Sequence, residues 1–210
     1  MRKVLLVIIF CIPFLGKAQV KWGIRAGLNF SSIKFNSFNP EKKLLTRLNA
    51  GTTIEIPIDE NWLVLTGPYY AGKGIIHTRS LMTNRIDSVT IRLNYIELPI
   101  NIGYKFAEEN NNQFTIAGGP YISYGFNGII SIRNSQTPPT TRLHKKETDQ
   151  YKRLEAGFNF SGLYEIKERY GIRVDFSKSL LNIARVEKQK NIVVGFSLYW
   201  YMKKKATLEE

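Results

Sequence analysis

The fold of this chain is decided by the stretch Trp22-Gly23-Ile24-Arg25-Ala26-Gly27-Leu28-Asn29-Phe30. Apolar side chains occupy every second position, and glycine, arginine and asparagine fill the positions between them. Successive side chains of a β-strand point to opposite faces, so this strand has one apolar face and one polar face. The stretch therefore predicts a strand that separates an apolar environment from a polar one.

The same alternation recurs in eight segments, which turns and polar connectors separate. The expected strands cover residues 21–31, 47–57, 62–75, 89–106, 114–130, 151–164, 170–176 and 191–202. Within the fourth segment the apolar residues change phase at Tyr95-Ile96, which predicts a bulge or bend near Pro99. No heptad or low-complexity tract divides the series, so we expect one domain.

Residues 1–18 have the three parts of a secretory signal peptide. Arg2 and Lys3 form a charged start, residues 4–15 are apolar, and Gly16-Lys17-Ala18 is a small-x-small cleavage site. The apolar part is too short to cross a bilayer as a helix. We therefore expect export across the inner membrane.

Removal of this signal would leave residues 19–210 as the mature domain and would take away Cys11, the only cysteine. The mature protein then has no thiol for a disulfide, a thiolate metal site or a nucleophile. The formal charge of +13 would fall by three, to +10. Because the protein is exported, this basic excess does not indicate nucleic acid as a partner.

The connectors between the expected strands alternate in length. Those near residues 59, 109 and 167 are short, whereas those near 39, 82, 140 and 185 are long. Outer-membrane barrels have an even number of antiparallel strands, short periplasmic turns and long external loops. The sequence thus predicts an all-β, eight-stranded antiparallel up-and-down transmembrane β-barrel in the outer membrane of a Gram-negative cell, with both termini periplasmic.

Charge follows the same division, because the short turns are mainly acidic and the long loops are mainly basic. Such a basic outer rim would attract the phosphates of lipopolysaccharide. An ordinary solvated loop surface is the alternative interpretation. The residues that we expect to contact a partner or an anion are Arg142, Lys145 and Lys146.

The polar face of the expected strands carries charges of both signs. In a narrow lumen such charges neutralise one another, and side chains nearly fill a barrel of eight strands, so we expect a structural network and no conducting pore. The residues assigned to this lumen network are Arg25, Glu55, Arg92, Glu97, Glu155, Arg173 and Asp175.

Alternation alone also fits a soluble, lipocalin-like barrel that turns its apolar face inward around a ligand. Charges on the polar face and aromatic residues near the strand ends favour the membrane barrel, because a girdle of aromatic side chains lies at each membrane interface. The aromatic residues in question are Trp22, Phe30, Trp62, Tyr104, Phe106, Phe114, Tyr170 and Trp200.

Small barrels also include lipid-modifying enzymes, so a histidine and serine pair at the outer rim is a second alternative. His77 with Ser80, or His144 with Ser135, could act on lipid A as base and nucleophile. No acid is placed by the sequence to orient either histidine. Two histidines without an acidic cluster do not predict a metal site, and we expect neither a cofactor nor an enzyme.

Four segments resemble the PorT-like outer-membrane β-barrel family of Bacteroidetes. They are Gly23 to Ser31, Leu93-Asn-Tyr-Ile-Glu-Leu-Pro99, Gly119-Pro120-Tyr121 and Ser179-Leu-Leu-Asn-Ile183. The chain differs at Leu65-Thr-Gly-Pro-Tyr-Tyr70, where members often carry a Gln-Pro-Glu-like segment. The resemblance implies an eight-stranded barrel with a non-catalytic role in the envelope, including that of an accessory to type IX protein secretion that contacts an envelope or secretion-system protein.

Overall fold

The structure is a computed structural model and describes residues 20–35, 41–81, 85–107, 112–134, 141–143, 150–185 and 188–202. Within these ranges no helix is long and apolar enough to cross a membrane. The expected signal peptide lies outside the described residues and stays a prediction.

The described strands close into a ring that confirms the predicted fold class. The strands of the ring are β1 (Lys21–Phe35), β3 (Leu45–Pro57), β4 (Trp62–Thr66) continued by β5 (Tyr69–Leu81), β6 (Arg85–Ala107), β7 (Gln113–Asn134), β9 (Leu154–Ile166), β10 (Tyr170–Ser179) and β11 (Gln189–Tyr201). Each strand pairs antiparallel with its neighbours in sequence, and β1 pairs with both β3 and β11. Two short strands, β2 (Glu41–Lys43) and β8 (Thr141–Leu143), pair with β5 and β7.

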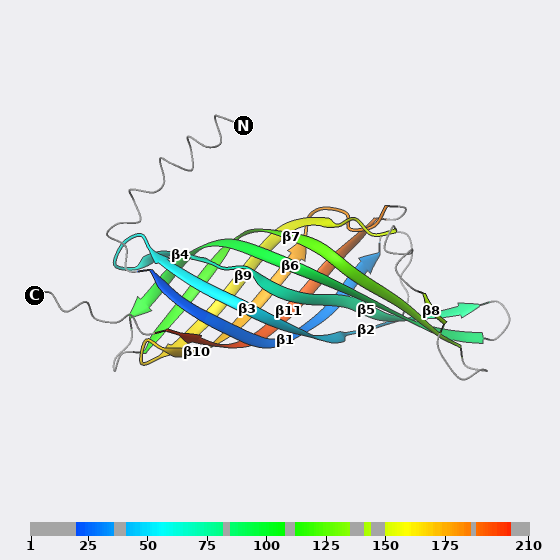
Figure 1. The fold of residues 1–210 in the computed structure, drawn as a ribbon, viewed down its shortest axis with the longest axis horizontal. Coiled ribbons are helices and arrows are strands. Elements are labelled where there is room, and N and C mark those ends of the chain that lie inside the picture. The colour runs from blue at the N-terminus through cyan, green and yellow to red at the C-terminus, as the bar shows by residue number, and fades with distance from the viewer. Residues whose placement is uncertain are drawn as a thin grey trace, which may run out of the picture.

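The barrel has two different ends. We call the end with the short connectors 58–61 and 167–169 the turn end, where β1 begins and β11 finishes. Lys167 and Glu168 both have positive φ, at 52° and 55°, which is the conformation of a tight type I′ hairpin. At the opposite end, the loop end, β5 to β8 extend past the other strands (Figure 1).

The third expected strand is interrupted between β4 and β5. Pro68 has no amide to donate to a neighbouring strand, and Gly67 has a φ of 125°, a value that side chains rarely allow. The carbonyl of Pro68 instead accepts a hydrogen bond of 3.0 Å from the amide of Thr52. One expected strand is therefore two shorter ones that share the same place in the ring.

The predicted phase change in β6 has a different cause from the one expected. The strand alternates without a slip, and Ile91, Leu93 and Tyr95 all point inward, as does Pro99. A bulge does lie nearby, between Asn94 and Tyr95 in the pairing with β7. The apolar residues change phase because the interior itself is apolar at the loop end.

The outward face is an apolar belt that surrounds the ring. Nearly every strand contributes large exposed side chains, among them Leu98 and Ile100 on β6 and Val174 on β10. At the turn end the ring of Trp62 packs edge-to-face on Tyr104 with centroids 5.2 Å apart, and Tyr104 packs on Phe106 at 4.8 Å. These contacts give the belt the aromatic girdle that the sequence predicts.

The interior is layered along the barrel axis. An apolar cluster fills the loop end, and it includes Ile33, Ile75, Tyr95 and Ile183. A second cluster, which includes Leu63 and Tyr201, lies toward the turn end. Buried charged and amide side chains occupy the middle.

Val174→Arg tests which face meets lipid. Val174 points outward in the middle of β10, and we expect the arginine to lower the free energy of unfolding in lipid vesicles by about 2–4 kcal/mol. Thr46→Arg at the loop end is the control and should cost no more than about 1 kcal/mol. Equal losses for the two variants, measured by urea titration, would contradict the membrane orientation.

Candidate functional site

The middle of the lumen is organised around a buried lysine, Lys73 on β5. Its Nζ lies 2.6 Å from Glu97 Oε2 and 2.9 Å from Glu155 Oε1, and all three side chains are no more than 1% exposed. Tyr121 donates a 2.7 Å hydrogen bond to Glu155 Oε1, and Asn191 donates one of 2.7 Å to its Oε2. Glu155 is thus bound by side chains from three strands, β5, β7 and β11.

A second buried group surrounds Asp175 on β10. Arg173 Nε donates to Asp175 Oδ1 at 2.7 Å, and the hydroxyl of Ser161 donates to the same oxygen at 2.6 Å. Arg25 Nη2 from β1 lies 3.4 Å from Asp175 Oδ2. Two arginines therefore share one carboxylate in this group.

Tyr69 joins the two groups. The guanidinium of Arg25 stacks on its ring at 3.8 Å, and its hydroxyl donates a short hydrogen bond to Glu97. The group around Lys73 carries one excess negative charge and the group around Asp175 one excess positive charge, so the joined network is neutral. Buried charges that are paired and hydrogen-bonded in this way hold the strands together and leave no free charge facing a pore.

The structure places Arg25, Glu97, Glu155, Arg173 and Asp175 in this central network. Glu55 is buried nearer the turn end, where it contacts Lys105 at 2.5 Å and Lys21 at 3.9 Å. Lys21 also contacts Glu165 at 3.0 Å. A cavity of about 240 Å³ opens at this end, and its lining includes Lys21, Glu55, Lys105 and residues 59–61 of the connector.

Arg92 differs from its prediction. It lies in the outward phase of β6, half-buried, with Nη1 3.5 Å from the hydroxyl of Ser131. The prediction assumed that its neighbours Ile91 and Leu93 face lipid, but both fill the apolar cluster at the loop end. The cation that the lumen uses instead is Lys73, which sequence analysis missed, although it shares the inward phase of Tyr69 and Ile75.

The loop end of the lumen is closed by a folded loop. Ile183, fully buried, enters the apolar cluster, while Asn182 accepts hydrogen bonds from the amides of Gln189 at 2.7 Å and Ala184 at 3.4 Å. The amide of Lys152 donates to the carbonyl of Ile183 at 2.7 Å, which ties the loop to the residues just before β9. The segment Ser179 to Ile183, one of the four that resemble the PorT-like family, is this closure.

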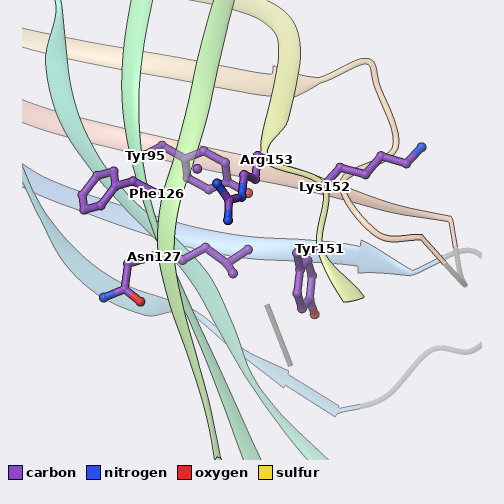
Figure 2. A pocket seen from close by; sticks show the side chains of 8 residues that line it. Tyr95, Phe126, Asn127, Tyr151, Lys152 and Arg153 are labelled. Atoms are coloured by element: carbon purple, nitrogen blue, oxygen red, sulfur yellow. The ribbon is translucent and has the colours of Figure 1, made fainter. Parts of the chain in front are cut away.

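Beside this closure a small cavity lies between β7 and residues 151–153 (Figure 2). Tyr95, Phe126, Tyr151 and Arg153 are among its lining residues, and its volume is about 40 Å³. A space of this size holds water but neither a sugar nor an acyl chain. It is therefore no ligand site of the kind that a lipocalin-like barrel requires.

His77 lies inside the loop end. It is 8% exposed and packs against the ring of Phe35 with centroids 5.5 Å apart. Ser80 is three residues further along the same continuous strand, at a backbone separation of roughly 10 Å. His144 and Ser135, the other expected pair, lie outside the described residues.

The two ends of the barrel carry different charge. Among the side chains that the structure describes, the loop end has eleven basic residues and one acid, Glu41. The basic residues are Lys34, Lys42, Lys43, Arg47, Arg92, Lys152, Arg153, Lys178, Arg185, Lys188 and Lys190. The described turn end has five acids, Glu55, Asp59, Glu60, Glu165 and Glu168, against Lys21, Lys105, Lys167 and Arg169.

The three residues expected to contact a partner are only partly placed. Arg142 lies on β8, where its backbone pairs with Ser131 of β7 on the extension at the loop end. Lys145 and Lys146 lie outside the described residues. Their role stays a prediction.

Comparison with known proteins identifies one family. Residues 17–185 match the sequence model of a family described as "Outer membrane protein beta-barrel domain". No curated protein matches the chain significantly.

Several solved barrels are similar in structure. Ail of Yersinia pestis is 11% identical with a TM-score of 0.45, over 87% of this chain and 98% of that one. Neisserial surface protein A is 5% identical with a TM-score of 0.47, over 86% and 97% of the two chains. OprG of Pseudomonas aeruginosa is 12% identical with a TM-score of 0.41, over 90% and 99%.

Lys73→Met tests the central network. The change leaves Glu97 and Glu155 facing each other without their shared cation, so we expect a loss of about 3–5 kcal/mol in the free energy of unfolding. Adding Glu97→Gln and Glu155→Gln should restore most of this loss, because the uncompensated charges are removed. Lys43→Met, on the exposed surface, is the control and should stay within about 0.5 kcal/mol. A Lys73→Met barrel as stable as this control would show that the network contributes nothing.

Proposed function

This chain belongs to the family of outer membrane protein beta-barrel domains, and from that premise we propose that it is a closed, non-catalytic barrel whose loop end binds anionic material at the cell surface. The observation that carries the proposal is the charge of the loop end, where eleven described basic side chains face one acid. The protein is located in the outer membrane. Short turns of such barrels are periplasmic, so the loop end lies on the outside of the cell.

The interior supports a binding role over a transport role. A neutral network of paired charges fills the middle of the lumen, and apolar clusters lie on both sides of it. A barrel of eight strands has room for its own side chains and little else. Among the surfaces that the structure describes, the basic rim at the loop end is the one that we assign to function.

The chemistry of the described rim also favours binding over catalysis. His77 is buried against Phe35, and the backbone separates it from Ser80 by about three strand positions. A nucleophile and its base must lie within hydrogen-bond reach of each other. We therefore propose attraction of lipopolysaccharide phosphates, which clustered lysines and arginines bind by charge alone.

Binding to lipopolysaccharide is the direct test. The barrel in phosphatidylcholine nanodiscs should bind a lipopolysaccharide-coated surface at low salt, and the affinity should fall steeply as salt is raised, because screening weakens exposed charges. Empty nanodiscs are the control. Absence of binding at low salt, or binding that is insensitive to salt, would refute the proposal.

We extend the proposal to an accessory role in type IX protein secretion. Its support is the resemblance of four segments to the PorT-like family, one of which forms the loop that closes the barrel. A closed barrel would serve such a route as a docking component, since side chains fill the described part of its lumen and leave no path there for a protein chain. The extended β5 to β8 region, which carries Arg142, is the surface that we assign to the protein partner.

A pull-down from detergent-solubilised envelopes tests this extension. We expect secretion-system proteins to accompany the native barrel, and we expect fewer of them when Arg142, Lys145 and Lys146 are all changed to glutamine. Mass spectrometry identifies what is recovered. Recovery of the barrel alone would reject the accessory role and leave the autonomous surface barrel.

A further inference from the structure

We infer that Lys34, Lys178 and Lys190 form a binding site for a phosphorylated lipid of the outer leaflet, on the face of the barrel made by β1, β11 and β10. The inference rests on the proposed function, because it names the ligand and the position of anion binding at the loop end. The register of these three strands brings the lysines together.

Lys34 and Lys190 lie directly opposite each other in the pairing of β1 with β11. Both are in the outward phase, since Ile33, Phe35, Gln189 and Asn191 beside them are buried. Like charges directly opposite across two strands destabilise a sheet, and the Cβ atoms at such positions are about 5 Å apart. A lysine pair at this position therefore lowers the stability of the folded barrel unless an anion binds between the two ammonium groups.

Lys178 adds a third cation to the pair. It lies opposite Ile192 in the pairing of β10 with β11, which places it diagonal to Lys190 at about 7–8 Å. Its outward phase is fixed by Ser177 and Ser179, which are buried on either side. Three adjacent strands thus present three ammonium groups on one face.

None of the three lysines has an intramolecular counter-charge within the part of the chain that the structure describes. The ion pairs formed there involve other lysines and arginines, all of them facing the lumen or the turn end. Lys34 and Lys178 are exposed, and Lys190 is half-buried. The charge of this lysine triad is therefore available to a ligand.

The surroundings of the lysine triad indicate a lipid. Lys178 lies opposite Phe158 of β9, and Phe176 lies one side-chain step nearer the turn end on the same face. Phe30 occupies the equivalent level on β1, where its ring packs edge-to-face on Phe196 at 5.9 Å. The cations thus stand at the edge of the apolar belt, at the height where head groups meet acyl chains.

The number of cations favours a phosphomonoester. A phosphomonoester carries about 1.5 to 2 negative charges at neutral pH, whereas the phosphodiester of a phospholipid carries one. Three lysines with no neighbouring acid in the described structure match the greater charge. Lipid A, with its phosphates on an acylated sugar, has this chemistry and lies in the outer leaflet.

The test uses the full barrel in zwitterionic micelles, with lipid A as the probe and phosphatidylglycerol as the comparison. Bound lipid is measured by native mass spectrometry and by the rise in the heat-unfolding midpoint. We expect lipid A to bind more tightly than phosphatidylglycerol. The triple variant K34Q/K178Q/K190Q should lose about fivefold in affinity per lysine, or roughly a hundredfold in all.

Two further variants distinguish a specific contribution of the lysine triad from the effect of net charge. K42Q/K43Q/K152Q has the same net charge and should weaken lipid A binding far less, because it loses only long-range attraction. Lys34→Glu places opposite charges across from each other, so it should raise the unfolding midpoint without lipid and abolish the rise that lipid A gives. A Lys34→Glu barrel that is less stable than wild type without lipid would contradict the repulsion on which the inference depends.

The outcomes also distinguish failure of the lysine triad as a site from failure of the proposed function. If the wild type binds lipid A and both triple variants weaken equally, the site is refuted while the basic rim stands. If phosphatidylglycerol binds as well as lipid A and depends equally on the triad, the assignment to phosphomonoesters is refuted. If the wild type binds no anionic lipid, the proposed function fails with it.

Discussion

Closure of the sheet between β1 and β11 is the constraint on which the rest of the structure depends. A membrane offers no partner to an unpaired backbone amide or carbonyl, so a sheet can cross it only when no edge is left. The thirteen paired positions from Gly23 with Tyr201 to Phe35 with Gln189 remove that edge. Once the ring is closed, each side chain must face either lipid or lumen, and the period-two sequence satisfies both environments.

The lumen follows from this closure. Alternation places charged and amide side chains inside, in the middle of the barrel between the two apolar clusters, and a narrow barrel cannot hydrate these charges separately. The chain solves this with pairs that cross the lumen, such as Lys73 from β5 with Glu155 from β9. The same pairs tie strands together that share no backbone hydrogen bonds.

The sequence predicts every strand of the ring because the belt imposes a strict pattern on all of them. It does not predict that β5 continues to Leu81 and that β6 already begins at Arg85, where a long connector is expected. The side of the barrel wall on which Arg92 and Lys73 lie does not follow from this pattern, because the interior departs from it at the loop end. There Ile91 and Leu93 fill the lumen, so apolar character no longer marks the outward face. The acid that pairs with a given lysine lies across the ring, far away in the sequence. Lys73 and Glu155, for example, are 82 positions apart in the chain.

The basic residues of the loop end fall into two populations because the strands differ in length. Those of β10, β11 and β1 stop at the edge of the apolar belt, so their cations stand beside the lipid. Strands β5 to β8 continue beyond that level (Figure 1), and the backbone carries Arg142 away from the belt. Basic residues near the belt lie at the level of the lipid head groups, whereas those on the extension lie further from the membrane. The unequal strands thus give the proposed lipid site and the proposed partner surface separate places on one basic rim.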